Sequence, residues 1–96
     1  MIADHGAWIE QVGEVDLTGG WAEVTLAAEF QRRADTAGYQ VCLTSYDAML
    51  VFVQNRTSGG FEIHTLPVRG LRHRGGGRCG YRVVAPRRSE ASSGAT

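Results

Sequence analysis

The chain contains no lysine, only two prolines and only two cysteines among its 96 residues. All ten basic side chains are arginines, which genomic codon usage explains most simply, although arginine also favours forked, planar contacts. No apolar run approaches the roughly 20 residues that a membrane-spanning helix needs. The N-terminus lacks the basic and apolar regions of a secretory signal. We therefore expect no membrane insertion, and a protein that is soluble or is exported by another route, such as assembly into a particle.

The two cysteines, Cys42 and Cys79, both fall on predicted strands. They could form a disulfide only if their Cα atoms lay within about 7 Å of each other. Isolated strand cysteines are more often small, buried apolar side chains. The sequence leaves open whether these two pair.

The net charge is zero, but the charges are unevenly placed along the chain. Residues 1–35 hold seven acids and two arginines, whereas residues 36–96 hold eight arginines and three acids. Opposite charge in the two halves can attract within one chain or between chains. The distribution is therefore compatible with either a folded monomer or a charged contact between copies.

Alternation of apolar and polar residues is the strongest signal in the chain. From Gly38 to Phe61 the period is two, and Tyr39, Val41 and Leu43 fall on one side of a strand. Turn residues separate such runs, and this pattern predicts antiparallel strands with one buried face. The expected strands are 7–12 (extended or followed by a second short strand at 13–17), 21–26, 39–44, 49–54, 61–65 and 79–85.

The predicted fold is all-β, an antiparallel β-sandwich or a compact barrel with one short helical turn at residues 27–34 that points Phe30 inward. We expect a flexible leader at 1–6, a single β domain at 7–88 and a disordered tail at 89–96. The predicted core consists of Val24, Leu26, Phe30, Tyr39, Val41, Leu43, Val51, Val53, Phe61, Ile63, Tyr81 and Val83.

Two features are candidates for ligand binding. The segment 69–78 combines glycines with Arg69, Arg72, Arg74 and Arg78, which could present guanidinium groups and backbone N–H groups to phosphate, sulfate or an acidic sugar. An exposed hairpin loop needs polar residues in any case, so a solvated loop is the simpler interpretation of the segment. Trp21 shares its predicted face with glutamate and threonine, and it is therefore the aromatic residue most expected to be exposed.

Catalytic and metal-binding patterns are weak. His64, His73 and Cys79 do not have a recognised zinc spacing. No Gly-x-Ser-x-Gly elbow accompanies the serines, so a nucleophilic triad has no supporting motif. We expect no enzyme activity, no metal and no cofactor.

The order of several segments resembles a β module found near the C-termini of phage tail-fibre-like and other bacterial or viral surface-fibre proteins. In the N-terminal half the resemblance rests on Ala7-Trp8-Ile9-Glu10-Gln11-Val12-Gly13-Glu14, Leu17-Thr18-Gly19-Gly20-Trp21-Ala22-Glu23-Val24-Thr25-Leu26 and Glu29-Phe30. Further along it rests on Tyr39-Gln40-Val41-Cys42-Leu43-Thr44, Leu50-Val51-Phe52-Val53-Gln54-Asn55-Arg56-Thr57, Gly60-Phe61-Glu62-Ile63 and Tyr81-Arg82-Val83-Val84-Ala85-Pro86-Arg87.

The resemblance implies a non-catalytic structural or attachment module of a fibre or virion-like assembly, located on a virion or a cell-surface particle. Its expected partners are other copies of the chain, with a trimer favoured, and a surface glycan. The chain departs from the family in its basic loop at Arg72, His73 and Arg74, and in Cys79. The alternative function is a nucleic-acid or polyanion-binding module that uses the Arg69–Arg78 loop, and nucleic acid is the less favoured partner.

Overall fold

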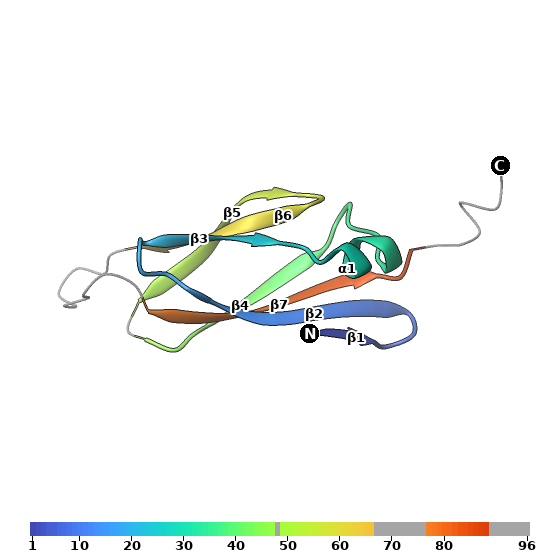
Figure 1. Ribbon diagram of the computed structural model, residues 1–96, viewed down its shortest axis with the longest axis horizontal. Helices are drawn as coiled ribbons and strands as arrows, with labels where there is room; N and C mark the ends of the chain where they lie inside the picture. The colour runs from blue at the N-terminus through green and yellow to red at the C-terminus, as the bar shows by residue number, and fades with distance from the viewer. Residues whose placement is uncertain (48, 67–76, 89–96) are drawn as a thin grey trace.

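The computed structural model describes residues 1–47, 49–66 and 77–88, and these form two antiparallel sheets that face each other (Figure 1). The four-stranded sheet has the order β1 (Ile2–Asp4), β2 (Trp8–Asp16), β7 (Arg78–Pro86), β4 (Gln40–Ser45). The three-stranded sheet has the order β3 (Trp21–Thr25), β6 (Gly60–Leu66), β5 (Leu50–Thr57). The all-β prediction is confirmed, and of its two forms the described residues adopt the open sandwich rather than a closed barrel.

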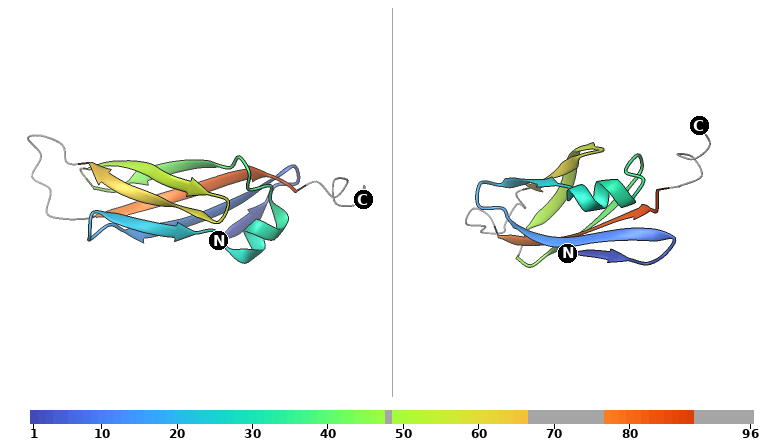
Figure 2. Two further views of the ribbon diagram at one scale, coloured as in Figure 1. Left: turned by 90° about the horizontal axis from the view of Figure 1, so that it is seen from above. Right: turned by 45° about the vertical axis from the view of Figure 1, so that its right-hand side comes forward.

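The core lies between the inner faces of the two sheets, which overlie one another when the molecule is seen from above (Figure 2). All twelve predicted core residues are either buried or packed against the buried cluster, because alternation assigned each strand's inner face correctly. The cluster also contains six residues that the prediction omitted: Ile9, Leu17, Ala34, Met49, Cys79 and Ala85.

Strand β2 runs without interruption through Gly13, so residues 13–16 extend the first strand instead of forming a second one. Gly13 pairs with Tyr81 on β7, and the Tyr81 ring lies over the position that a β-carbon at Gly13 would occupy. The ring thus replaces the packing that glycine lacks in a strand. This cover explains why a central glycine does not break the strand.

The expectation of a loose leader is wrong for residues 2–4, which form β1 and pair with β2 in the register Ile2 to Gln11. Two backbone hydrogen bonds extend this pairing to Met1 and Val12. Three residues without marked alternation are too few to be predicted as a strand, and here the edge of β2 supplies the hydrogen-bonding partners. The predicted tail at 89–96 lies outside the described residues.

The short helix α1 (Ala28–Arg33) forms where expected and buries Phe30. Its N-cap residue, Ala27, has no side chain that could accept a hydrogen bond from the first turn. The buried amide of Gln11 on β2 accepts the Ala27 N–H at 2.9 Å instead. A glutamine sixteen residues earlier in the chain therefore fixes the start of the helix against the four-stranded sheet.

A buried tyrosine joins the two sheets near the turn between β5 and β6. The Tyr39 hydroxyl lies 2.7 Å from the carbonyl oxygen of Thr57 and 2.8 Å from that of Gly60. The Arg56 guanidinium sits over the Tyr39 ring and donates to the Tyr39 carbonyl at 2.8 Å. Burial raises the pKa of the Tyr39 hydroxyl, which keeps it protonated as a donor to these carbonyls.

Candidate contact surfaces on the two outer faces

An aromatic ladder crosses the outer face of the three-stranded sheet. Its three members, Trp21 on β3, His64 on β6 and Phe52 on β5, are directly paired across the strands. The His64 ring is stacked on Trp21 with centroids 5.6 Å apart, and on Phe52 with centroids 5.8 Å apart. Both neighbours of the imidazole are therefore aromatic, and cross-strand pairs of this kind stabilise a sheet.

The stacking determines which ring surfaces of the aromatic ladder a partner can contact. Trp21 is 49% exposed, which confirms that it points outward. Rings this close and this nearly parallel must stack through their faces, since rings side by side in one plane would clash. One face of Trp21 is therefore partly covered by His64. The partly covered rings form a continuous apolar surface, which suits apolar contact with a partner.

Leucines and carboxylates border the aromatic ladder on its two sides. Leu50 and Leu66 pair directly across β5 and β6, and each is about half exposed. On the other side Glu23 lies opposite Glu62. Like charges directly opposite each other destabilise a strand pair, so this acidic row is not explained by sheet stability.

Glu62 is held in place by two hydrogen bonds. Its Oε1 lies 2.8 Å from His64 Nε2 and 2.9 Å from Asn55 Nδ2. The hydrogen bond from His64 lowers the pKa of the Glu62 carboxyl, and the one from Asn55 lowers it further. Glu62 is therefore ionised at neutral pH.

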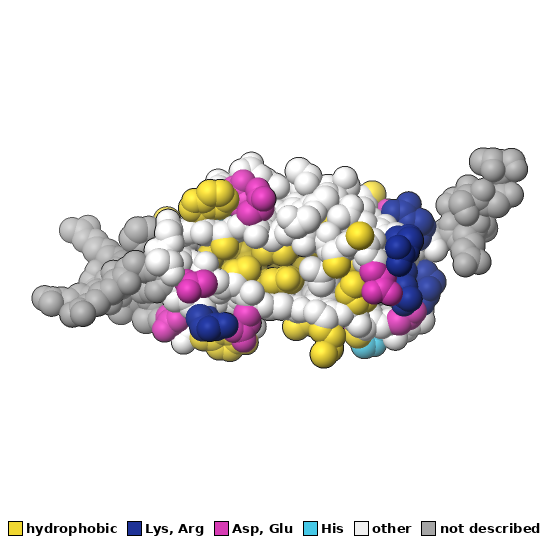
Figure 3. Space-filling model, in the orientation of Figure 1, with side chains coloured by type: hydrophobic (Ala, Val, Ile, Leu, Met, Phe, Trp, Pro, Cys, Tyr) yellow, Lys and Arg dark blue, Asp and Glu magenta, His cyan; other side chains and the backbone are white. Residues whose placement is uncertain are grey.

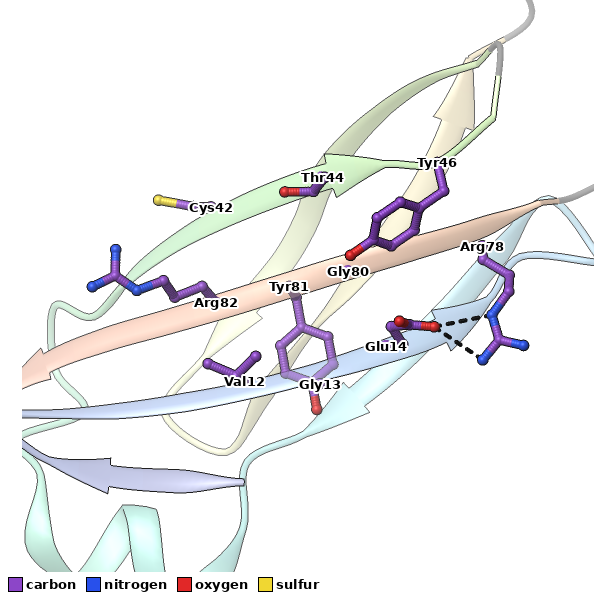
Figure 4. Close-up of a pocket in the computed structure, with 10 residues that line it drawn as sticks. All are labelled: Val12, Gly13, Glu14, Cys42, Thr44, Tyr46, Arg78, Gly80, Tyr81 and Arg82. Carbon is purple, nitrogen blue, oxygen red and sulfur yellow. Dashed lines mark hydrogen bonds and ion pairs between the residues drawn. The ribbon is translucent and has the colours of Figure 1, made fainter.

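The outer face of the four-stranded sheet carries a hollow, which we call the Gly80 groove (Figure 4). Its volume is about 630 Å³. Gly80 lies between Glu14 on β2 and Thr44 on β4, so the middle residue of that row has no side chain. Tyr46 reaches over this gap, with its hydroxyl 2.9 Å from the position of a β-carbon at Gly80. The groove is lined by Val12, Gly13, Glu14, Cys42, Thr44, Tyr46, Arg78, Gly80, Tyr81 and Arg82.

Two arginines at the groove are paired with carboxylates of β2. Arg78 donates from Nε and Nη2 to the same Glu14 oxygen, each at 3.0 Å. Arg82 forms an ion pair with Glu10, which also contacts His5. The hydrogen bond from Arg82 is the main reason that the pKa of the Glu10 carboxyl is lowered. The charges of the groove are thus largely compensated.

The predicted anion-binding arginines are only partly placed by the structure. Arg78 begins β7 and lines the Gly80 groove in its ion pair with Glu14. Arg69, Arg72 and Arg74 lie outside the described residues, as does His73. The polyanion-binding alternative stays a prediction.

A different set of arginines gathers at the end of the molecule that carries α1 (Figure 3). Arg33 and Arg87 both pair with Asp4, and Arg88 donates to the Gln31 carbonyl at 2.9 Å. The two contacts of Arg87 with Asp4 and Gly6 hold the end of β7 against the turn after β1. These arginines link segments that are far apart in the sequence, so no local motif could indicate their contacts.

The two cysteines are both free, with Cys79 buried and Cys42 exposed. Cys79 faces the core from β7, while Cys42 lies on the outer face of β4 opposite Arg82. A disulfide between them is excluded because their side chains leave opposite faces of one sheet.

Within residues 1–47, 49–66 and 77–88, no three His, Cys, Asp or Glu side chains are grouped closely enough to hold a metal ion. In the same part of the chain, no helix has the length and apolar character to cross a membrane.

Comparison of the chain with protein-family models, with curated proteins and with solved structures finds no match.

Proposed function

We propose that this protein is a non-catalytic attachment module of a fibre-like or virion-like assembly, and that the outer face of the three-stranded sheet is its contact surface with other copies of the chain. The single observation that supports the proposal is the exposed apolar band formed by Leu50, Leu66 and the aromatic ladder. Trp21, Phe52, Leu50 and Leu66 are all exposed on adjacent strands, and contiguous exposed apolar side chains of this kind often mark a contact site.

The arrangement of the band fits a protein–protein contact. Interfaces combine an apolar centre with a polar rim that stays in contact with water. A contact centred on Leu50 and Leu66 would bury these leucines first and the aromatic ladder next to them. Glu23 and Glu62 would then lie at the rim, where carboxylates remain solvated. The described residues of this face include no arginine, so a self-contact would not bury an unpaired guanidinium.

The test is sedimentation velocity of the full chain over about 5–500 µM, a range that covers contacts of modest affinity. We expect reversible self-association, with a trimer as the favoured species. Leu50→Asp places a charge at the centre of the band and should weaken association at least tenfold. Because Leu50 is already half exposed, the variant should keep its fold.

Val12→Asp is the matched control, since Val12 is an exposed apolar residue on the outer face of the other sheet. It should leave the association constant unchanged. A wild-type chain that stays monomeric at every concentration, or equal effects of the two variants, would contradict the proposal.

A further inference from the structure

We propose that the Gly80 groove is a binding site for a neutral saccharide, independent of the contact surface on the three-stranded sheet. The groove has the volume of a small-molecule site, combines an exposed aromatic ring with polar groups that lack partners, and carries compensated charge. Each of these properties follows from a particular residue.

The shape of the hollow depends on one glycine, which the Tyr46 ring covers. Side chains stand on the outer face at every second residue of β7, and Gly80 interrupts this row between Arg78 and Arg82. Along the same cross-strand row, Glu14 and Thr44 stand on either side of the gap. A β-carbon at position 80 would lie 2.9 Å from the Tyr46 hydroxyl, so the Tyr46 ring would have to move away from β7.

The aromatic surface is supplied by Tyr46. The ring crosses β7 with its hydroxyl end over Gly80 and is seen broadly from the solvent side in Figure 4. Tyr46 is 59% exposed, and no aromatic ring among the described residues stacks on it, in contrast to Trp21. The apolar C–H face of a pyranose ring can therefore pack on the exposed face of Tyr46.

The polar groups around the ring include donors and acceptors without partners. Within the described part of the chain, the hydroxyls of Thr44 and Tyr46 form no hydrogen bond, and Glu14 uses only Oε1 to bind Arg78. This leaves Glu14 Oε2 as an acceptor and the two hydroxyls as both donors and acceptors. A ligand that carries many hydroxyl groups matches this mixture.

The charge of the groove favours a neutral ligand over an acidic one. Arg78 is neutralised by Glu14, and Arg82 by Glu10. An anionic ligand would meet guanidinium groups whose charge is already compensated, and it would lie close to the Glu14 and Glu10 carboxylates, whereas a hydroxyl can bind beside the intact pairs. Neutral sugars should therefore bind better than uronic acids.

The experiment uses maltose, lactose and cellobiose as neutral probes, and glucuronic acid as the acidic probe, each at about 10 mM because single-site sugar contacts are commonly in the millimolar range. Saturation-transfer NMR detects binding, and amide shifts of Thr44, Tyr46 and Gly80 locate it. We expect at least one neutral disaccharide to bind and to shift these amides, and glucuronic acid to bind more weakly.

Tyr46→Ala removes the ring and Gly80→Ala displaces it, and each should weaken binding about fivefold or more. Trp8→Ala is the control, because Trp8 is an exposed aromatic residue at the far end of the same face. Circular dichroism verifies that every variant is folded, and Tyr46→Ala tests the site alone if Gly80→Ala unfolds.

Three results would overturn the inference: no neutral probe binds, glucuronic acid binds more tightly than all of them, or Tyr46→Ala binds like the wild type. None of these results depends on self-association. Leu50→Asp should bind the same sugar with unchanged affinity, so the two proposals can fail separately.

Discussion

At the scale of single residues, three strand glycines differ in which atoms lie at the position that a β-carbon would occupy. Aromatic rings cover Gly13 on the inner face and Gly80 on the outer face of the four-stranded sheet. Gly60 is different, because the carbonyl of Val24 on the neighbouring strand occupies the place of its β-carbon. A ring can move aside for a methyl group, but a paired backbone cannot move without disturbing the sheet.

Gly60→Ala should therefore lower the free energy of unfolding by about 1–3 kcal/mol, because the added methyl group overpacks the contact between β3 and β6. The neighbouring Gly59 has open space around its β-carbon position and is the matched control. Gly59→Ala should change stability by less than about 0.5 kcal/mol. Urea denaturation of both variants measures the difference. Equal losses in the two would show that the close approach at Gly60 does not constrain the sheet.

At the scale of elements, the aromatic ladder and its bordering glutamate tie three strands together through side chains. His64 stacks on rings from β3 and β5 and shares a hydrogen bond with Glu62 on its own strand. Asn55 on β5 binds the same carboxylate. The ionised form of Glu62 is thus favoured in the folded protein, which links the stability of the three-stranded sheet to pH.

The sign of this linkage follows from the lowered pKa of Glu62. A carboxyl whose pKa is lower in the folded state than in the unfolded state stabilises the fold at pH values above its unfolded-state pKa. This stabilisation is lost as the pH falls through the folded-state pKa. Glu62→Gln cannot titrate, so its stability should decline less than that of the wild type between about pH 5 and pH 3. Urea midpoints measured across this range give the comparison.

Part of the decline should persist in Glu62→Gln, because the pKa values of Asp4 and Glu10 are also lowered, by hydrogen bonds from Arg87 and Arg82. Parallel pH profiles for the variant and the wild type would mean that the hydrogen bonds to Glu62 do not favour its ionised form.

At the scale of the whole molecule, the sandwich has a buried interior and an exposed exterior, and one cysteine lies in each. Cys42 is exposed on the outer face, and Cys79 is fully buried between the sheets. Burial raises the pKa of the Cys79 thiol, which further reduces its reactivity.

A thiol reagent such as Ellman's reagent should therefore modify one cysteine in the folded protein and both after unfolding in guanidinium chloride. Cys42→Ser should abolish the fast reaction of the folded protein, whereas Cys79→Ser should leave it intact. Rapid modification of two thiols under native conditions would contradict the placement of Cys79 in the core.

Much of the fold could be predicted because each strand carries its own signal. Alternation in β3 separates Trp21 from Val24, and the same rule orients Tyr39 in front of β4 and Ile63 on β6. The β1 strand could not be predicted, since its pairing comes from β2 rather than from its own three residues. Gln11 was missed for a similar reason, because it caps a helix that lies sixteen residues away.

The candidate sites also differ in whether they depend on one strand or on several neighbouring strands. The exposure of Trp21 is a local property of its strand and followed from alternation. The stacking of His64 between Trp21 and Phe52 depends on which strands become neighbours, and the sequence contains no motif for that. The Gly80 groove needs β2, β7 and β4 side by side in one register, so neither Tyr46 nor Glu14 could be recognised as part of a site.

For the strands that carry an alternating pattern, the amino-acid order alone fixes which face is buried, because a period of two requires no partner strand. The strand order arises only on folding, and with it the aromatic ladder, the Gly80 groove and the separation of the two cysteines. Side chains on different strands meet only after the backbone hydrogen bonds have fixed neighbours and register. Residues as far apart as Glu14 and Arg78 acquire their joint chemistry at that point.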